Sequence, residues 1–214
     1  MPREHFSHVD TWVFDLDNTL YPPHMRLFDQ IEVKMTDFVM RTLGVSRSEA
    51  DGLRSRYWAE YGTTLAGLMH HHDIDPEPYL AQVHDISFAP LAPDHDLAGR
   101  ISALSGRKIV YTNGTAAYAE NLLGARGLSG LFDAVYGVED ARYRPKPHEA
   151  AFAEVFAKAG LTPGSAAMFE DDPRNLSAPH AMGMRTVHVA AERIEAAHIH
   201  HHTDDLGGFL ARLI

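Results

Sequence analysis

Two aspartates separated by one residue, Asp15 and Asp17, directly follow the apolar run TWVF near the start of the sequence. Ionised carboxylates held this close repel each other, and the repulsion raises the pKa of one of them. A divalent cation with oxygen ligands offsets the repulsion, and a free carboxylate beside it can serve as a nucleophile. The pair therefore predicts a metal site with a reactive carboxylate.

Three further segments place polar groups at or shortly after the ends of predicted strands: Thr112-Asn113-Gly114, Lys146 between two prolines, and Glu170-Asp171-Asp172. Ligands of an open α/β sheet bind beyond the carboxyl ends of its strands, so we expect these groups to converge. Oxygen ligands suit Mg²⁺, Lys146 adds a positive charge, and Thr112 with the turn after it offers donors to an anion. The combination predicts phosphoryl transfer with an aspartate as covalent nucleophile.

An alternation of strands and helices is expected to position these groups. Five β-rich runs are predicted as strands: TWVFDLD, KIVYTNG, LFDAVYG, SAAMFEDD and RTVHVA. Helical patterns, one of them near PRNLSAPHAMG, separate the last four, and this order implies right-handed crossovers and a mostly parallel sheet. The fold class is therefore predicted as α/β, with a Rossmann-like parallel sheet core.

The segment after the first strand has a different pattern. Apolar residues recur at helical spacing from Leu27 to Val39, SRSE has the form of a capping box, and no strand pattern interrupts the region. We expect a small all-helical cap domain over residues 23–94, inserted into a catalytic core formed by residues 1–22 and 95–214. The apolar stripe of Phe28, Met35 and Phe38 is interpreted as packing.

Composition excludes several classes of protein. The 214 residues include no Cys, which excludes disulfides, thiolate metal sites and a thiol nucleophile. A net charge of −10 argues against a partner that is a nucleic acid polymer. Neither a signal peptide nor a membrane-spanning run is recognisable, so a cytoplasmic protein with no membrane partner is expected.

Four motifs, DLDNTLYP, YTNGT, RPKP and FEDDPRN, occur in this order at or shortly after predicted strand ends. They resemble the four motifs of the haloacid dehalogenase superfamily of phosphohydrolases, and the helical insertion resembles the small cap of that superfamily. The form DLDNTLYP, which leads straight into the cap, is most similar to the pyrimidine 5′-nucleotidase branch. The resemblance implies Mg²⁺ as cofactor and a small phosphorylated metabolite as substrate.

The resemblance also implies roles for individual residues. Asp15 would be the nucleophile that forms an aspartyl-phosphate, and Asp17 the general acid and then the base. Asp17 would also give the metal its backbone carbonyl. Thr112 and the Asn113 N–H would bind the phosphoryl group together with Lys146.

The last motif supplies the remaining expected metal ligands. Asp171 would be the metal carboxylate, alongside Asp15, and Glu170 a second ligand, either direct or through water. Asp172 and Asn175 are expected to orient Lys146 or to cap the next helix, because Asp before Pro173 fits an N-cap.

The expected function is a Mg²⁺-dependent phosphomonoesterase acting on a small metabolite, with a pyrimidine nucleoside 5′-monophosphate as the leading substrate. A phosphomutase and a phosphoglycolate or sugar-phosphate phosphatase are alternatives on the same scaffold. A dehalogenase is disfavoured because it needs neither a metal nor Asp17. A receiver-like signalling module is disfavoured because it has no helical insertion and no second aspartate placed for turnover.

Two histidine clusters, His70–His72 and HIHHH from His198 to His202, raise the question of a transition-metal site. Neither cluster adjoins a motif. Both are predicted to be exposed histidines at a helix end or in a loop.

Overall fold

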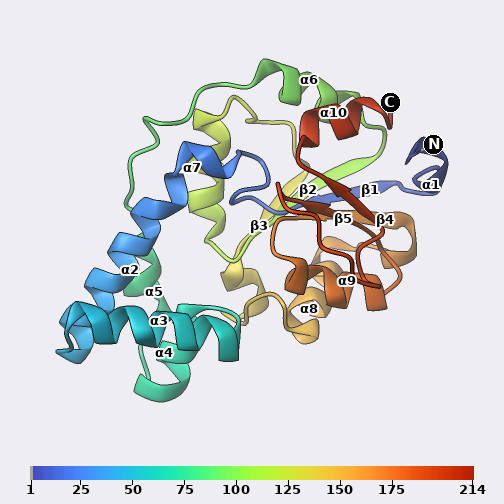
Figure 1. Cartoon of the computed structure of the whole chain (residues 1–214). Helices are drawn as coiled ribbons and strands as arrows, with labels where there is room; N and C mark the ends of the chain where they lie inside the picture. The colour runs from blue at the N-terminus through green and yellow to red at the C-terminus, as the bar shows by residue number, and fades with distance from the viewer. Residues whose placement is uncertain (1) are drawn as a thin grey trace.

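The computed structural model of the protein describes residues 2–214 and contains a six-stranded parallel sheet (Figure 1). The strands are Thr11–Phe14 (β1), Arg107–Tyr111 (β2), Ala134–Tyr136 (β3), Ala166–Glu170 (β4), Arg185–Val189 (β5) and His201–Thr203 (β6). Their order is β3-β2-β1-β4-β5-β6, so β1 lies between β2 and β4. The strand order reverses at this point, which is where such sheets bind ligands. The predicted parallel α/β core is confirmed.

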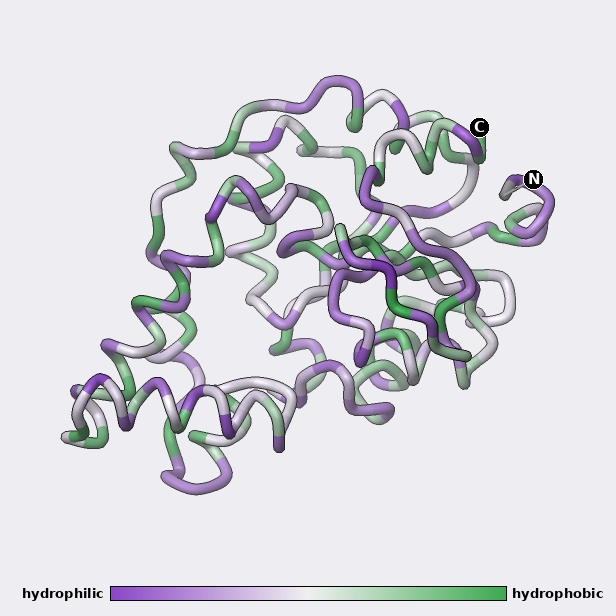
Figure 2. The backbone as a smooth tube through the Cα atoms, in the orientation of Figure 1, coloured by the Kyte–Doolittle hydropathy of each residue, from purple (hydrophilic) through white to green (hydrophobic). Residues whose placement is uncertain are grey.

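Helices cover both faces of the sheet, as the apolar strands require. Trp12 and Phe14 belong to one buried cluster and Val13 to the other, in keeping with side chains that alternate along a strand. The Val13 face is covered by Glu149–Ala159 (α8) and Ser177–Ala181 (α9), and the opposite face by His95–Ala103 (α6), Ala116–Ala125 (α7) and Leu206–Ala211 (α10). Figure 2 shows apolar stretches in the strands and alternating apolar and polar residues along the helices.

Only helices lie between β1 and β2 in the described chain. The last of them is α6, and those before it are Pro23–Met25 (η1, a 3₁₀ turn), Leu27–Leu43 (α2), Arg47–Tyr61 (α3), Thr64–His72 (α4) and Pro76–Val83 (α5). The helices α2 to α5 pack mainly on one another and lie to one side of the sheet in Figure 1. The predicted capping box is present, with Ser46 and Glu49 bonded reciprocally. The division into a cap of residues 23–94 and a core stays a prediction.

Some elements were not predicted. A short helix, Pro2–His5 (α1), precedes β1, and α10 follows β6. The region near PRNLSAPHAMG forms a 3₁₀ turn, Pro173–Leu176 (η4), before the short α9. The expectation of an exposed histidine loop was wrong for His201 and His202, which are half-buried in β6 because β5 pairs with them.

No helix within residues 2–214 is both long enough and apolar enough to cross a membrane. The 3₁₀ turns Val138–Ala141 (η2) and Pro163–Ser165 (η3) complete the described elements. The former leads into the loop that carries Lys146, and the latter leads into β4. Both turns therefore help to position residues of the predicted site.

Candidate active site

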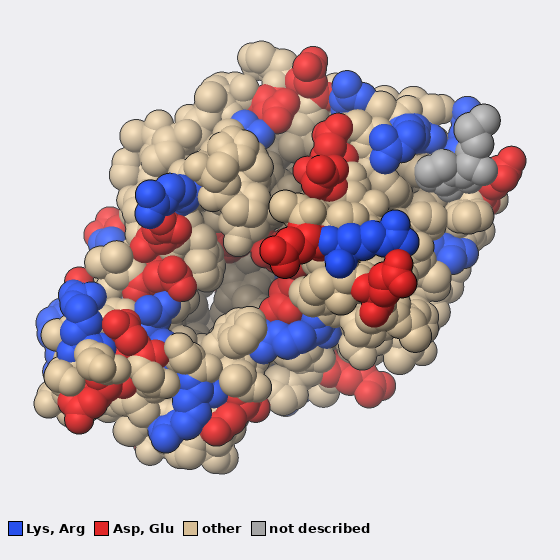
Figure 3. Space-filling model, in the orientation of Figure 1, with Lys and Arg blue, Asp and Glu red and all other residues tan. Residues whose placement is uncertain are grey.

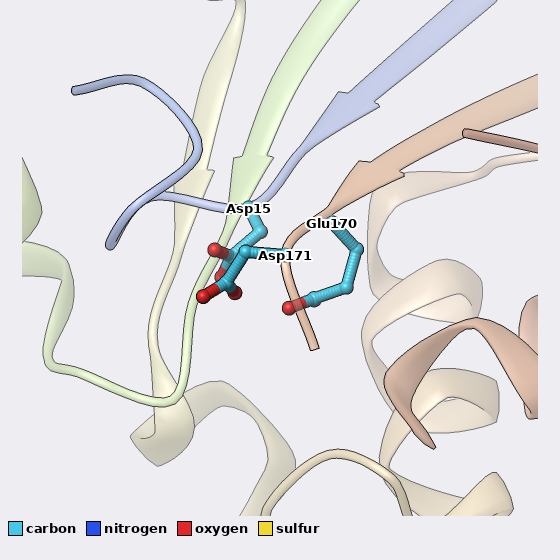
Figure 4. Close-up of side chains that lie close together, drawn as sticks. All are labelled: Asp15, Glu170 and Asp171. Atoms are coloured by element: carbon cyan, nitrogen blue, oxygen red, sulfur yellow. The ribbon is translucent and has the colours of Figure 1, made fainter. Parts of the chain in front are cut away.

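The carboxyl ends of the central strands bring the predicted site residues together. Asp15 directly follows β1, Thr112 follows β2, and Glu170 and Asp171 lie at the end of β4. Lys146 comes from the loop after β3, and its Nζ atom lies 2.6 Å from Asp15 Oδ1 and 2.6 Å from Glu170 Oε2. Figure 4 shows the three carboxylates at the ends of neighbouring strands, directed toward a common space. The expected convergence is found.

Lys146 is a buried ammonium group whose three N–H donors are all used. They point to Asp15, to Glu170 and to the backbone carbonyl of Tyr111, which lies 3.1 Å from Nζ. Burial by itself would lower the pKa of Lys146, but the two carboxylates raise it well above its usual value. Lys146 therefore keeps its charge and balances part of the negative charge around it.

The backbone of Lys146 is held from two sides. The Asn113 side chain accepts from the Lys146 N–H at 2.8 Å and donates to the Lys146 carbonyl at 3.1 Å. On the other side, a Cβ atom at Gly62, the C-cap of α3 with φ +86°, would lie 2.9 Å from Pro147 Cδ. From the sequence, Asn113 was expected to act only through its backbone N–H, so this side-chain clamp was not predicted.

Three carboxylates crowd this site. Asp15, Glu170 and Asp171 each offer an oxygen, and these oxygens all lie within 4.8 Å of one another. Burial, followed by the charge of neighbouring carboxylates, raises the pKa of Asp171 to about 10 and of Asp15 to about 7. When all three carboxyl groups are ionised, the single ammonium of Lys146 leaves the site with a net negative charge. An all-oxygen donor set of this kind fits a hard divalent cation such as Mg²⁺.

Glu170 has partners on both of its oxygens. Oε2 accepts from Lys146, and Oε1 accepts from the backbone N–H of Asp172 at 3.2 Å. Asp172 caps η4 by accepting from Arg174 N, as the capping alternative predicted. Within this last motif, the carboxylate that contacts Lys146 is thus Glu170 and not Asp172. Asn175 is buried, and its Oδ1 atom has no hydrogen-bond partner within residues 2–214.

Asp171 is supported from two directions. Asn18 Nδ2 donates to Asp171 Oδ2 at 3.3 Å, and Asn18 has a left-handed φ of 59°, which asparagine tolerates better than most residues. His188 of β5 is buried, and its Nε2 lies 2.9 Å from the Asp171 carbonyl oxygen. His188 was not predicted as a site residue, because only the pairing of β5 with β4 brings it there.

Asp17 is not part of the three-carboxylate group and is held by two tyrosines. Tyr21 and Tyr118 both donate to its Oδ1 atom, at 2.8 and 2.6 Å. Burial raises the pKa of Asp17 to about 6, against the lowering effect of these hydrogen bonds. Neither tyrosine was predicted to contact the site, although Tyr21 follows Asp17 by four residues, a spacing that favours contact within a turn.

Two threonine hydroxyls face the same region. Thr19 Oγ1 donates to Asp15 Oδ2 at 3.1 Å, which ties it to the predicted nucleophile. Thr112 is buried and its Oγ1 accepts from the Gly114 N–H at 2.9 Å. The Thr112 hydroxyl proton is therefore available for a phosphoryl oxygen.

The histidine clusters lie apart from these carboxylates. His70, His71 and His72 are exposed at the end of α4, where His71 and His72 bond the Tyr61 and Tyr57 hydroxyls at 2.8 Å. An open cavity of about 460 Å³ borders the other cluster and is lined by residues 193–197 and 199–202. Within residues 2–214, the only three-residue group with metal-ligand spacing is Asp15, Glu170 and Asp171.

The site opens toward the helices α2 to α5. Figure 3 shows a deep hollow near the middle of this face, between those helices and the carboxyl ends of the strands. Arg174, which is paired with Asp172, stacks on Trp58 of α3 with its guanidinium carbon 3.5 Å from the ring centroid. The helices α2 to α5 therefore form one wall of the hollow.

Known proteins share the fold and sequence pattern of this chain. Phosphate metabolism protein 8 of Saccharomyces cerevisiae is 28% identical over 190 residues, which cover 80% of this chain and 58% of the relative. The chain therefore spans little more than half the length of that curated relative. CbbY from Rhodobacter sphaeroides, solved in complex with phosphate, has a TM-score of 0.63 at 18% identity, covering 93% of this chain and 95% of that one.

A 2-haloacid dehalogenase from Pseudomonas syringae pv. Tomato DC3000 has a TM-score of 0.60 at 20% identity, covering 96% of this chain and all of that one. Structural likeness at these identities shows a common fold. A family model described as haloacid dehalogenase-like hydrolase matches residues 9–183. This match covers most of the chain, which therefore belongs to the haloacid dehalogenase-like hydrolases.

Proposed function

We propose that the protein is a Mg²⁺-dependent phosphomonoesterase that hydrolyses a small phosphorylated metabolite through an aspartyl-phosphate. The observation that carries this proposal is the contact between Asp15 and the Lys146 ammonium inside a cluster of carboxylates that suits a divalent cation. The presence of Asp17 and Asp171 favours a phosphatase over a dehalogenase, which needs neither a metal nor a second aspartate.

The reaction has two displacements at phosphorus. In the first, an Asp15 oxygen attacks phosphorus, the bond to the leaving oxygen breaks, and Asp17 gives that oxygen a proton. In the second, water attacks the aspartyl-phosphate while Asp17 takes a proton from it, which releases phosphate and restores both carboxyl groups. The net reaction consumes one water and produces an alcohol and phosphate.

The other residues bind and balance charge. Lys146, the Thr112 hydroxyl and the Asn113 N–H would contact the phosphoryl oxygens. Asp15, Asp171 and the Asp17 carbonyl would hold Mg²⁺, which when bound neutralises charge on the phosphoryl group. Glu170, with one oxygen on Lys146 and the other on the backbone, is assigned to holding Lys146 in place.

The substrate class is a finer proposal. A pyrimidine nucleoside 5′-monophosphate is the leading candidate, because DLDNTLYP is most similar to that branch of the family. Phosphoglycolate, a sugar phosphate and the substrate of a phosphomutase remain alternatives for the same residues.

We expect the protein to release phosphate from at least one small phosphomonoester, and excess chelator to reduce the rate by at least about a hundredfold. The assay measures phosphate from UMP, CMP, dTMP, AMP, GMP, sugar phosphates and phosphoglycolate, with Mg²⁺ or with chelator. Preference for the pyrimidine nucleotides supports the finer proposal, and metal-dependent release from another member replaces only the substrate. No release from any member contradicts the phosphatase assignment.

Asp17→Asn is expected to lower turnover by about 10²–10⁴-fold, because both displacements need a proton transfer at this position. If the water step slows more, the variant accumulates phosphorylated protein, which intact-mass measurement after rapid quenching detects. Asp29→Asn is the matched control, since Asp29 pairs with Arg26 on the surface and should not affect the rate. Wild-type turnover in Asp17→Asn would remove Asp17 from the mechanism.

A further inference from the structure

Two tyrosines hold a single oxygen of Asp17. The hydroxyls of Tyr21 and Tyr118 both donate to Oδ1, at 2.8 and 2.6 Å, and both rings are almost fully buried. A carboxylate oxygen has two lone pairs, so two donors saturate it. The proton that Asp17 gives or takes must therefore sit on Oδ2.

Both phenols remain donors under ordinary conditions. Burial and the negative charge of Asp17 raise the pKa of Tyr21 and of Tyr118 above the usual value. Each hydroxyl has a single proton, which lies on the bond to Oδ1. The carboxylate plane is thus held by two contacts from different parts of the chain, since Tyr118 is 101 residues from Asp17.

Tyr118 is itself positioned by His84, at the end of helix α5. The His84 ring, at the C-cap of α5, stacks on Tyr118 with centroids 4.3 Å apart and an interplanar angle of 11°. His84 Nδ1 also lies 3.3 Å from Thr115 Oγ1. Beneath the ring, a Cβ atom at Gly114 would lie 2.9 Å from Tyr118 Cδ1, so glycine allows this close approach.

We propose that Tyr21 and Tyr118 are positioning residues that orient Asp17 so that its Oδ2 atom exchanges protons with the leaving group and with water, and that His84 makes this orientation depend on α5. The inference rests on the proposed phosphatase function. Asp17 remains the group that donates the proton, and neither phenol gains or loses one during the reaction. The packing of His84, at the end of α5, on Tyr118 of α7 would thereby determine how Asp17 Oδ2 is oriented for proton transfer.

The test compares two aryl phosphates of nearly equal size. Phenyl phosphate has a basic leaving group that needs a proton, whereas 4-nitrophenyl phosphate has an acidic leaving group that does not. For Tyr118→Phe and Tyr21→Phe we expect kcat/KM on phenyl phosphate to fall by at least about ten-fold, the loss of one hydrogen bond to a charged group. On 4-nitrophenyl phosphate we expect a fall of less than about three-fold, because proton donation contributes little there.

A structural defect would affect both substrates equally. Tyr79→Phe is the matched control, since it removes a buried phenol oxygen from α5 at a position packed against Phe38. Thermal unfolding checks that each variant is folded, and Tyr21→Phe provides the second test if Tyr118→Phe is unstable. Equal losses on both substrates, or no loss on either, in folded variants would overturn the inference.

His84→Ala tests the connection to α5. Alone, it should lower kcat/KM selectively on phenyl phosphate, because Tyr118 loses the ring that holds it. In the Tyr118→Phe background the same change should have little further selective effect, since no hydroxyl remains to be positioned. Additive effects would contradict the connection. A wild-type protein without metal-dependent activity on any phosphomonoester would instead remove the proposed function, so the two failures are distinguishable.

Discussion

Asp15→Asn should abolish phosphate release, with a fall of at least about 10⁴-fold, while the protein stays folded. The amide has nearly the same shape as the carboxylate but cannot form the aspartyl-phosphate. The contact between Lys146 and Glu170 is retained, and repulsion among the three carboxylates is reduced. The loss should therefore come from chemistry and not from unfolding.

The sign of the stability change checks this interpretation. Without metal, the pKa of Asp15 is raised to about 7, above its unfolded value of 3.8. A carboxyl group with a raised pKa destabilises the folded state progressively as pH rises between these values. In chelator at pH 8, Asp15→Asn should thus unfold at the same temperature as the wild type or higher. Near-wild-type turnover would exclude Asp15 as nucleophile, and a lower unfolding temperature would contradict the electrostatic argument.

Lys146→Met should lose at least about 10³-fold in activity and about 3–5 kcal/mol in the free energy of unfolding near pH 8. Methionine is similar in length, but it leaves two buried carboxylates without their cation. Asp15 and Glu170 would each lose the bond to Nζ at 2.6 Å. The effect on stability should exceed that of any surface lysine.

The destabilisation should depend on pH. As pH falls from 8 to 5, through the raised pKa of Asp15, this carboxyl group takes up a proton, and the difference from wild type should shrink. Denaturant titrations in chelator at pH 8 and pH 5 measure it. Lys158→Met is the control, because the Lys158 side chain that pairs with Asp140 is itself exposed, and its loss should change the free energy of unfolding by at most about 1 kcal/mol. A loss that is equal at both pH values would show that packing, and not charge, explains the destabilisation.

The residues that were predictable from the sequence share one property. Asp15, Thr112 and Asp171 directly follow runs that read as strands, and parallel strands end at the same edge of a sheet. Lys146 could be added because prolines flank it within a motif. For these residues, local pattern and sheet geometry together were enough to predict that they meet.

The residues that were missed depend on contacts between distant segments. Tyr118 lies within a helix whose pattern indicates only packing, and its contact with Asp17 requires the seating of α7 beside the β1 loop. The Asn113 clamp on Lys146 joins two loops whose relative position no local pattern reveals. β6 was missed because it has only three residues, His201–Thr203, two of them histidines, and it pairs only where β5 is already in place.

The central position of β1 in the sheet determines how late in synthesis and folding the site can form. β1 is an early segment, yet its two partners are β2, which begins at Arg107, and β4, which begins at Ala166. Pairing over such distances is slow, because a long intervening loop must close first. A nascent chain that has not yet emerged through β4 holds Asp15 without Glu170 and Asp171. The mutually repelling carboxylates therefore meet only at a late step of folding, when most of the sheet is available to hold them together.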